Sequence, residues 1–211
     1  MKKKTTLAVL IIATALVAAC QRPEYNDASE FDVSPAANGK SLVITKYTGG
    51  WVIDIRVPPR INNKRVTEIG NTAFYADVGE LLNVTIPNGI VKIGDWAFSD
   101  NYLEEFTLPK TVKEIGVGAF ANNRLKRITI PGSVRKIGYR AFVWNPLTVI
   151  TIGKNVELET LSGYDTDKEE EWEYCAFELG YKVEFDEFYK ANGKKAGTYT
   201  VKDGAWTYQG R

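Results

Sequence analysis

Apolar and polar positions alternate with a fixed period between residues 81 and 153. Each unit begins with a leucine, places apolar residues three and five positions later, and closes with Pro or Gly. The leading leucines are Leu81, Leu103, Leu125 and Leu147, which are 22 residues apart. The alternation predicts one short strand per unit, with its apolar side chains turned inward. A fixed period of this length is typical of a solenoid, in which stacked units share one core.

The second half of each unit repeats in register with the first. An Ile-Gly pair is followed by an Ala-Phe pair; the Ala-Phe pairs are Ala97-Phe98, Ala119-Phe120 and Ala141-Phe142. We expect the Ile to line the opposite wall, and the Gly to occupy a tight corner or one with positive φ. The Ala-Phe pair is predicted to form a short helical turn whose Phe fills the core. A degenerate unit over residues 52–74 carries insertions, as terminal repeats of solenoids often do.

The unit L-x-x-[VFI]-T-[IL]-P-x-x-[VI]-x-x-I-G-x-x-A-F resembles the BspA-like leucine-rich repeat family over roughly residues 42–153. The resemblance implies an α+β repeat fold, a right-handed leucine-rich repeat solenoid with short strands. It also implies a bacterial surface protein, since some members are implicated in adhesion to host or partner-cell proteins. One column departs from the family, because many of its repeats carry Cys where this chain has Asn101, Asn123 and Asn145. Asn amides bond turn backbone, so we expect the fold to be unaffected.

The two ends of the repeat region carry hairpin signals. Asn38-Gly39 lies between apolar runs before the repeats, and Asp203-Gly204 does so after them. These dipeptides favour two-residue β-hairpin turns. We expect β-hairpins to cap the solenoid at both ends, because its core and sheet edges must be covered. The predicted organisation is a lipoprotein signal peptide over residues 1–19, a flexible tether over 20–35, the solenoid with its N-terminal cap over 36–155, and a C-terminal capping region over 156–211.

An acidic insertion interrupts the pattern over residues 163–173. The spacing of Asp165, Asp167 and Glu169 hints at a calcium loop, but the segment lacks the glycine and the distal Glu that such a loop needs. A solvated acidic loop is the favoured interpretation. Cys175 follows it; a lone Cys in an exported protein is either a reactive thiol or a buried, inert one. Its aromatic neighbours favour the buried alternative.

The start of the chain has the features of an export signal. Three lysines follow Met1, and residues 7–17 form an apolar run too short for a membrane span. The motif Val17-Ala18-Ala19-Cys20 resembles a bacterial lipobox and predicts Cys20 as the lipid anchor. Two or more acyl chains hold a protein on a membrane, since each buried methylene contributes ~0.8 kcal/mol. The alternative is an ordinary signal peptide cleaved near Ala19.

The amino-acid composition limits the catalytic and binding chemistry that the chain can carry out. The 211 residues have a net charge of +1 and contain no His. A near-neutral chain has no general attraction for nucleic acid. Without His it lacks the commonest general base and every imidazole metal ligand. We therefore expect no enzyme activity, no catalytic residues, no cofactor, no metal site and no nucleic-acid partner.

The outward strand positions form the candidate binding surface, which we call the strand face. Its residues are Arg56, Asn83, Thr85, Glu105, Thr107, Arg127 and Thr129. Solenoids bind partners across such extended surfaces, and Arg is enriched among energetic hot spots. The same residues also fit a plain solvent face, because Thr columns and opposite charges stabilise sheets. Trp51, Trp96 and Trp144 mark a competing location on the corners.

These features predict a surface-exposed bacterial lipoprotein. It would be lipid-anchored to the cell envelope through Cys20, in the outer membrane or at the cell surface. Its solenoid would bind a protein or other macromolecular partner as a monomer, as an adhesin for host or partner-cell proteins. The alternative is a structural or assembly component of the envelope without a foreign ligand. An enzyme acting on surface glycan is disfavoured, because no acidic pair in the repeats stands out from ordinary surface charge.

Overall fold

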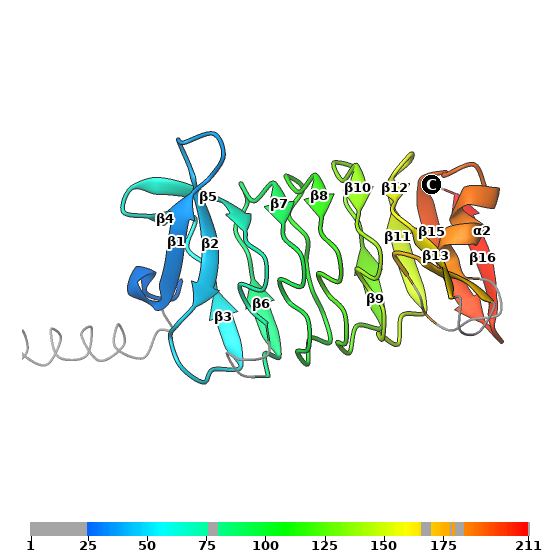
Figure 1. Cartoon of the computed structure of the whole chain (residues 1–211), viewed down its shortest axis with the longest axis horizontal. Helices are drawn as coiled ribbons and strands as arrows, with labels where there is room; N and C mark the ends of the chain where they lie inside the picture. The colour runs from blue at the N-terminus through cyan, green and yellow to red at the C-terminus, as the bar shows by residue number, and fades with distance from the viewer. Residues whose placement is uncertain (1–24, 76–79, 166–169, 178, 180–183, 211) are drawn as a thin grey trace, which may run out of the picture.

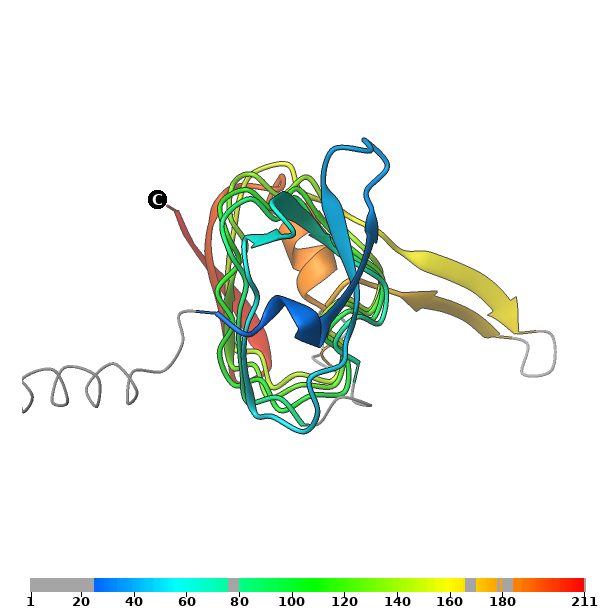
Figure 2. The ribbon, with the colours of Figure 1, turned by 90° about the vertical axis from the view of Figure 1, so that its left-hand side faces the viewer.

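Each sequence repeat folds as one coil of an elongated solenoid, and the coils stack along its long axis (Figure 1). Viewed along that axis, the coils superpose as a flattened ring with the two walls facing each other (Figure 2). This computed structural model describes residues 25–75, 80–165, 170–177, 179 and 184–210. It is a β-solenoid of about five turns with little helix, which confirms the predicted repeat solenoid.

One wall is an eight-stranded sheet in the order β1-β2-β5-β7-β8-β10-β12, with β4 paired to β5. Its strands are β1 (Phe31–Pro35), β2 (Leu42–Tyr47), β4 (Arg60–Ile61), β5 (Lys64–Ile69), β7 (Lys92–Ile93), β8 (Glu114–Ile115), β10 (Lys136–Ile137) and β12 (Glu157–Leu158). Pairing between successive coils is parallel, as in Ile93 opposite Ile115. The Ile of each Ile-Gly pair thus lines this wall, as the sequence predicts.

The other wall carries the strands that follow the leading leucines. They are β3 (Asp54–Arg56), β6 (Asn83–Thr85), β9 (Arg127–Thr129) and β11 (Val149–Ile152). β3 pairs with β6 and β9 pairs with β11, both in parallel. The coil between them has no strand at residues 105–107. The prediction of a strand in every unit is therefore wrong for this coil, and the wall is divided in two.

The core is a stack of aromatic rings, one from each coil. Phe74, Phe98, Phe120, Phe142 and Phe177 have no exposed surface. Their ring centroids are 5.1, 5.4, 5.4 and 4.7 Å apart in chain order, with near-parallel planes. Offset stacking adds to the energy gained from burying the rings. The Phe column is core, as the sequence predicts.

The Asn column forms a second internal ladder. Asn123 Oδ1 accepts the Leu103 N–H of the preceding coil at 3.1 Å, and its Nδ2 donates to the carbonyl oxygen of Phe98 at 2.8 Å. Asn101 and Asn145 make the equivalent bonds. Each buried amide therefore satisfies backbone groups that the turn would leave without partners.

The glycine of each Ile-Gly pair is required by space, not by its φ angle. A Cβ on Gly116 would lie 2.6 Å from the carbonyl carbon of Gly94, and one on Gly138 would lie 2.5 Å from the backbone nitrogen of Val117. Neighbouring coils touch backbone to backbone at this corner, so the corner is tight as expected but does not use positive φ.

Left-handed residues explain why the Ala-Phe pairs form hydrogen-bonded turns and not the expected helical turns. They lie two positions after each glycine and have φ between 55° and 58°: Thr72, Trp96, Gly118 and Arg140. A right-handed helix needs negative φ at every position. The chain therefore reverses at this point instead of continuing into a helix.

The N-terminal cap begins earlier than the sequence predicts. A short 3-10 helix, η1 (Ala28–Glu30), with Asp27 as its N-cap, precedes β1, and β1 pairs with β2 as an antiparallel hairpin. Phe31 is buried against Tyr47, with ring centroids 5.4 Å apart. Residues 25–35 therefore belong to the cap and not to the predicted tether, because Phe31 extends the core. The signal peptide and Cys20 lie outside the described residues.

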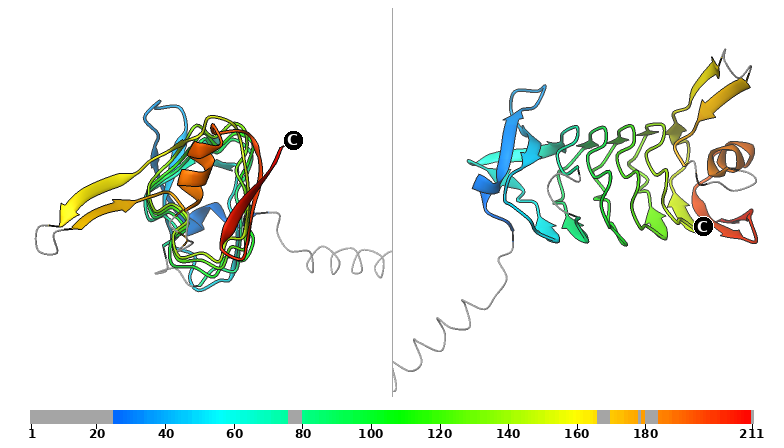
Figure 3. Two further views of the ribbon diagram at one scale, coloured as in Figure 1. Left: turned by 90° about the vertical axis from the view of Figure 1, so that its right-hand side faces the viewer. Right: turned by 60° about the horizontal axis from the view of Figure 1, so that its bottom comes forward.

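The C-terminal region caps the other end. β15 (Gly197–Lys202) and β16 (Ala205–Gly210) form a hairpin, and β15 pairs with β11 along the sheet edge. Helix α2 (Phe185–Ala191) covers the last coil, with Phe185 packed 4.8 Å from Phe177 between ring centroids. Figure 3 shows this helix lying across the end of the coils. Hairpins therefore cap both ends, as predicted.

The acidic insertion is a β-hairpin in place of the expected loop. β13 (Leu161–Asp165) and β14 (Glu170–Tyr174) pair antiparallel and project from the solenoid (Figures 2 and 3). Residues 166–169, which include two members of the discarded calcium pattern, lie outside the described residues. Cys175, at the base of the hairpin, is half-buried and not fully buried as expected.

Candidate functional site

The strand register brings the predicted strand-face residues together. Asp54 lies opposite Asn83 and Arg56 opposite Thr85, while Arg127 lies opposite Val149 and Thr129 opposite Thr151. Glu105 and Thr107 occupy the same positions on the coil between them. Six of the seven predicted residues are exposed, and Arg56 is half-buried. The sequence thus assigned all seven to one face correctly, although their role in binding stays a prediction.

The strand face is interrupted at the coil that carries Phe106. No backbone group of residues 105–107 forms a hydrogen bond with the described residues of either neighbouring coil. Backbone hydrogen bonds join these coils at the preceding corner. There the Tyr102 N–H donates to the carbonyl oxygen of Leu81, and the Arg124 N–H donates to that of Leu103, each at 3.0 Å.

We attribute the interruption to the size of Phe106. The equivalent positions hold Val84 and Ile128, which are smaller. The Phe106 ring packs against Phe98 and Phe120, with centroids 5.2 and 4.7 Å apart. Seating this ring among the stacked phenylalanines holds the coil away from ladder spacing.

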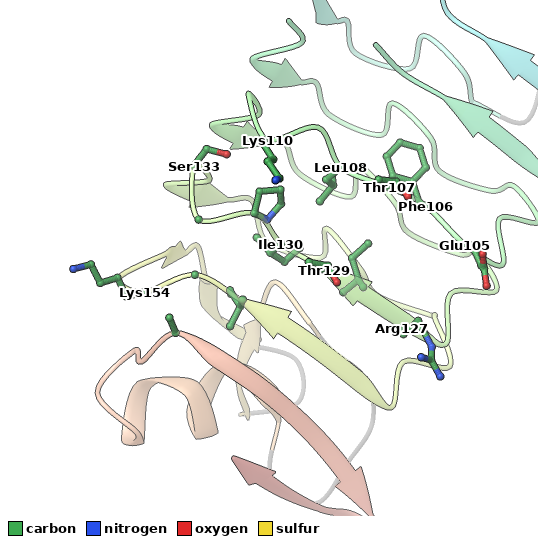
Figure 4. Close-up of a pocket in the computed structure, with 16 residues that line it drawn as sticks. Glu105, Phe106, Thr107, Leu108, Lys110, Arg127, Thr129, Ile130, Ser133 and Lys154 are labelled. Atoms are coloured by element: carbon green, nitrogen blue, oxygen red, sulfur yellow. The ribbon is translucent and has the colours of Figure 1, made fainter. Parts of the chain in front are cut away.

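Two hollows flank the interrupted coil. The larger, about 910 Å³, lies between residues 105–110 and 127–133 and extends to Lys154 and Ala196. The smaller, about 380 Å³, lies between residues 83–88 and 105–109. All of the predicted strand-face residues except Arg56 line one or both. In Figure 4, Glu105 and Arg127 lie at one end of the larger hollow, and Lys110, Ser133 and Lys154 lie at the other.

The larger hollow is positively charged. Lys110, Arg127 and Lys154 line it with Glu105 as the single carboxylate, and none of the three cations forms an ion pair with a described residue. Ser133 Oγ is buried there without a hydrogen-bond partner among the described residues. The hollow therefore offers positive charge and donors that have no partner among the described residues, and this combination favours an anionic ligand.

Sequence reasoning missed the basic end of this hollow. Lys110 and Lys154 each follow the Pro or Gly that closes the repeated apolar unit, and Gly132 holds this position on the coil between them. A Cβ on Gly132 would meet no atom within 4 Å, so the corner between the two lysines is open. The sequence did contain a signal for this pair, because each lysine comes directly after the last residue of the repeated apolar unit, Pro109 or Gly153.

The lining offers no catalytic set. Glu105 is the one carboxylate among the described residues that line this hollow, so these residues do not supply the paired carboxylates of acid–base hydrolysis. Across the described residues, no cluster of His, Cys, Asp or Glu is arranged to hold a metal ion. Nor does any helix in the described part of the chain have the length and apolar character to cross a membrane. The geometry of the strand face supports binding.

The competing tryptophan location is also partly accessible. Trp51 is 85% exposed and Trp144 is 61% exposed. Trp96 is half-buried, with its ring over Gly118, where a Cβ would lie 2.4 Å from the ring. The structure therefore leaves two of the three tryptophans open to a ligand.

Comparison with known proteins agrees with this fold. Residues 61–164 match the model of the BspA type leucine rich repeat region in six copies. A leucine-rich repeat protein from Bacteroides capillosus ATCC 29799 has a similar crystal structure, with 26% identity and a TM-score of 0.52, covering 62% of this chain and 99% of that one. The leucine rich repeat protein of T. pallidum has 24% identity and a TM-score of 0.48, covering 59% and 69%. No curated protein matched the sequence.

Proposed function

Because the chain belongs to the BspA-type leucine-rich repeat family, we propose that it is a surface lipoprotein that binds a protein partner across its strand face. Leucine-rich repeats generally serve protein binding, and solenoids use their extended faces for it. The lipid on Cys20 would hold the solenoid at the cell surface, where it would act as an adhesin.

The larger hollow is the observation that carries this proposal. It combines an opening in the sheet, about 910 Å³ in volume, with one carboxylate and three cations that form no ion pair with the described residues. An acidic segment of a partner fits this charge pattern, and its contacts would extend over the exposed Thr107 and Thr129. Polar contacts of this kind give affinity that falls as salt screens the charges.

Paired charge reversals test the strand face. The variant Lys110→Glu with Arg127→Glu should weaken binding to a purified extracellular-matrix protein by at least about tenfold, as expected for losing attractive charges and adding repulsive ones. The matched control, Lys64→Glu with Lys113→Glu, makes the same change in net charge on exposed lysines outside the hollows. Surface plasmon resonance at two salt concentrations measures both. Equal loss in the two variants would exclude the strand face as the binding surface.

Protease treatment of whole cells tests the location. A surface protein loses its solenoid to externally added protease, whereas an internal envelope component is protected until the cells are opened. Protection in intact cells would favour the structural role over the adhesin.

A further inference from the structure

A third hollow lies on the corner that precedes the strands, and it shares no lining residue with the two hollows of the strand face. It has a volume of about 330 Å³, and its side chains include Trp51, Glu80, Asp100, Tyr102, Asn122 and Arg124. Trp51, Glu80, Tyr102 and Arg124 each precede the first apolar residue of a strand unit, so they form one column across four coils. We call this the corner hollow.

The polar side chains of the corner hollow are already held in place. Tyr102 Oη donates to Glu80 at 2.5 Å, and Asn122 Nδ2 donates to Asp100 Oδ1 at 2.6 Å. The Arg124 guanidinium lies 3.8 Å above the centre of the Tyr102 ring. A ligand that binds here meets side chains that need little further ordering, which lowers the entropic cost of binding.

The backbone beneath these side chains is also fixed. Asp100 and Asn122 have left-handed φ angles of 59° and 53°. The buried amides of Asn101 and Asn123, directly after them, bond to the backbone of adjacent coils at 2.8–3.1 Å. The corner hollow therefore lies directly over the buried Asn ladder.

The lining chemistry identifies the class of ligand. The described residues that line the corner hollow include no aliphatic side chain; they carry aromatic, carboxylate, amide or guanidinium groups. Aromatic rings pack against the apolar C–H faces of a pyranose ring, while carboxylates, amides and guanidinium supply the donors and acceptors that hydroxyl groups need. Trp51 is 85% exposed, so most of its surface is open to a ligand.

The charge of the corner hollow and the spacing of the coils narrow the class of ligand further. Glu80 and Asp100 outnumber Arg124, so the corner hollow disfavours an anionic sugar. The column repeats with each coil, and the core rings of these coils stack at 5.1 and 5.4 Å. An extended sugar chain lying along the column would meet a new set of polar groups on each coil. We infer that the corner hollow is a binding site for a neutral glycan chain, with Trp51 as its stacking platform.

Affinity electrophoresis tests this site. The chain without residues 1–20, which keeps every described residue, is run in native gels that contain hydroxyethyl cellulose, xyloglucan or mannan, and in gels without polysaccharide. We expect retardation by at least one of the three. Trp51→Ala should then weaken binding about threefold to tenfold, the value of one aromatic contact, and Arg124→Ala should weaken it as well.

Two controls make the result specific. Trp144→Ala removes another exposed tryptophan outside the corner hollow, and Arg127→Glu alters the strand face; both should bind like wild type. The thermal unfolding of each variant confirms that it is folded. Absence of retardation in all three gels overturns the inference, as does unchanged binding by Trp51→Ala. Equal weakening by Trp144→Ala, or weakening by Arg127→Glu alone, would place any glycan elsewhere. None of these outcomes bears on protein binding at the strand face.

Discussion

Asp186 accepts hydrogen bonds at the C-terminal end of the solenoid that the next coil accepts elsewhere in the molecule. In the preceding coils the Phe N–H donates to an Ala carbonyl of the next coil, as Phe120 does to Ala141 at 2.8 Å. At the C-terminal end the carboxylate of Asp186 accepts the N–H groups of Ala176 and Phe177, each at 3.0 Å. Asp186 is 1% exposed, so Asp186→Ala leaves two buried donors without partners.

The cost of Asp186→Ala depends on pH in a direction that the structure fixes. Burial raises the pKa of the Asp186 carboxyl from 3.8 to about 6, against the lowering effect of its two N–H bonds. A raised pKa in the folded state contributes stability that is present below about pH 4 and lost as pH rises through about 6. Each unit of pKa shift corresponds to about 1.4 kcal/mol of folding free energy. Between pH 4 and pH 7 the wild type therefore loses on the order of 3 kcal/mol of stability. Asp186→Ala lacks the carboxyl group and does not show this loss.

Two orphaned donors cost about 1–3 kcal/mol each. We therefore expect Asp186→Ala to be destabilised by about 3 kcal/mol at pH 4 and by about 1 kcal/mol or less at pH 7. Total stabilities are typically about 5–15 kcal/mol, so the loss at pH 4 is readily measured. Urea unfolding followed by circular dichroism at both pH values gives the difference.

Glu187→Ala is the matched control, because it removes an exposed carboxylate from the same helix. It should change stability by less than about 0.5 kcal/mol. A loss in Asp186→Ala that grows from pH 4 to pH 7 would show that the native carboxylate is stabilised and refute the reasoning. Equal effects of the two substitutions at both pH values would refute the capping role.

Three further predictions concern the ladders and the anchor. Asn123→Ala should lower the free energy of unfolding by about 2–4 kcal/mol, because it leaves the Leu103 N–H and several carbonyl oxygens without their partner. The exposed Asn122→Ala should lower it less in the same urea assay, and the reverse order would contradict the role of the Asn ladder. Gly116→Ala should lower the melting temperature, since its Cβ would lie 2.6 Å from the neighbouring coil, whereas Gly132→Ala, which meets open space, should be neutral. Cys20→Ala should abolish labelling of cells by a palmitate analogue, and equal labelling of both proteins would disprove the anchor.

The sequence by itself determined the repeat and the inward direction of its side chains. The period of 22 residues defined the coil, and alternation along each strand assigned Val84 and Ile128 to the core. These features are local, because the direction of a side chain depends on its own strand. The Phe column and the hairpin signals at Asn38-Gly39 and Asp203-Gly204 were readable for the same reason. The seven strand-face residues were grouped correctly because equivalent positions of successive repeats lie side by side in neighbouring coils.

Only the tertiary structure decided how neighbouring coils meet. The sequence treats Phe106 as another apolar residue at a strand position, but its ring must share space with rings from two coils, and the ladder opens there. The sequence left open whether Gly116 serves a tight corner or a positive φ, and the structure shows that the backbone of the neighbouring coil excludes a side chain there. Spacing between coils depends on side chains from several repeats at once, which no single repeat records.

Long-range placement explains the remaining differences. Residues 25–35 of the predicted tether belong to the cap, because Phe31 is buried against Tyr47, a residue of the next strand. Lys110 and Lys154 line one hollow because the single coil between them carries Gly132 at the same position, which leaves the corner open. Trp51 and Tyr102 line one corner although insertions break the period between them. Local pattern sets the orientation of each side chain, while stacking selects which distant residues become neighbours.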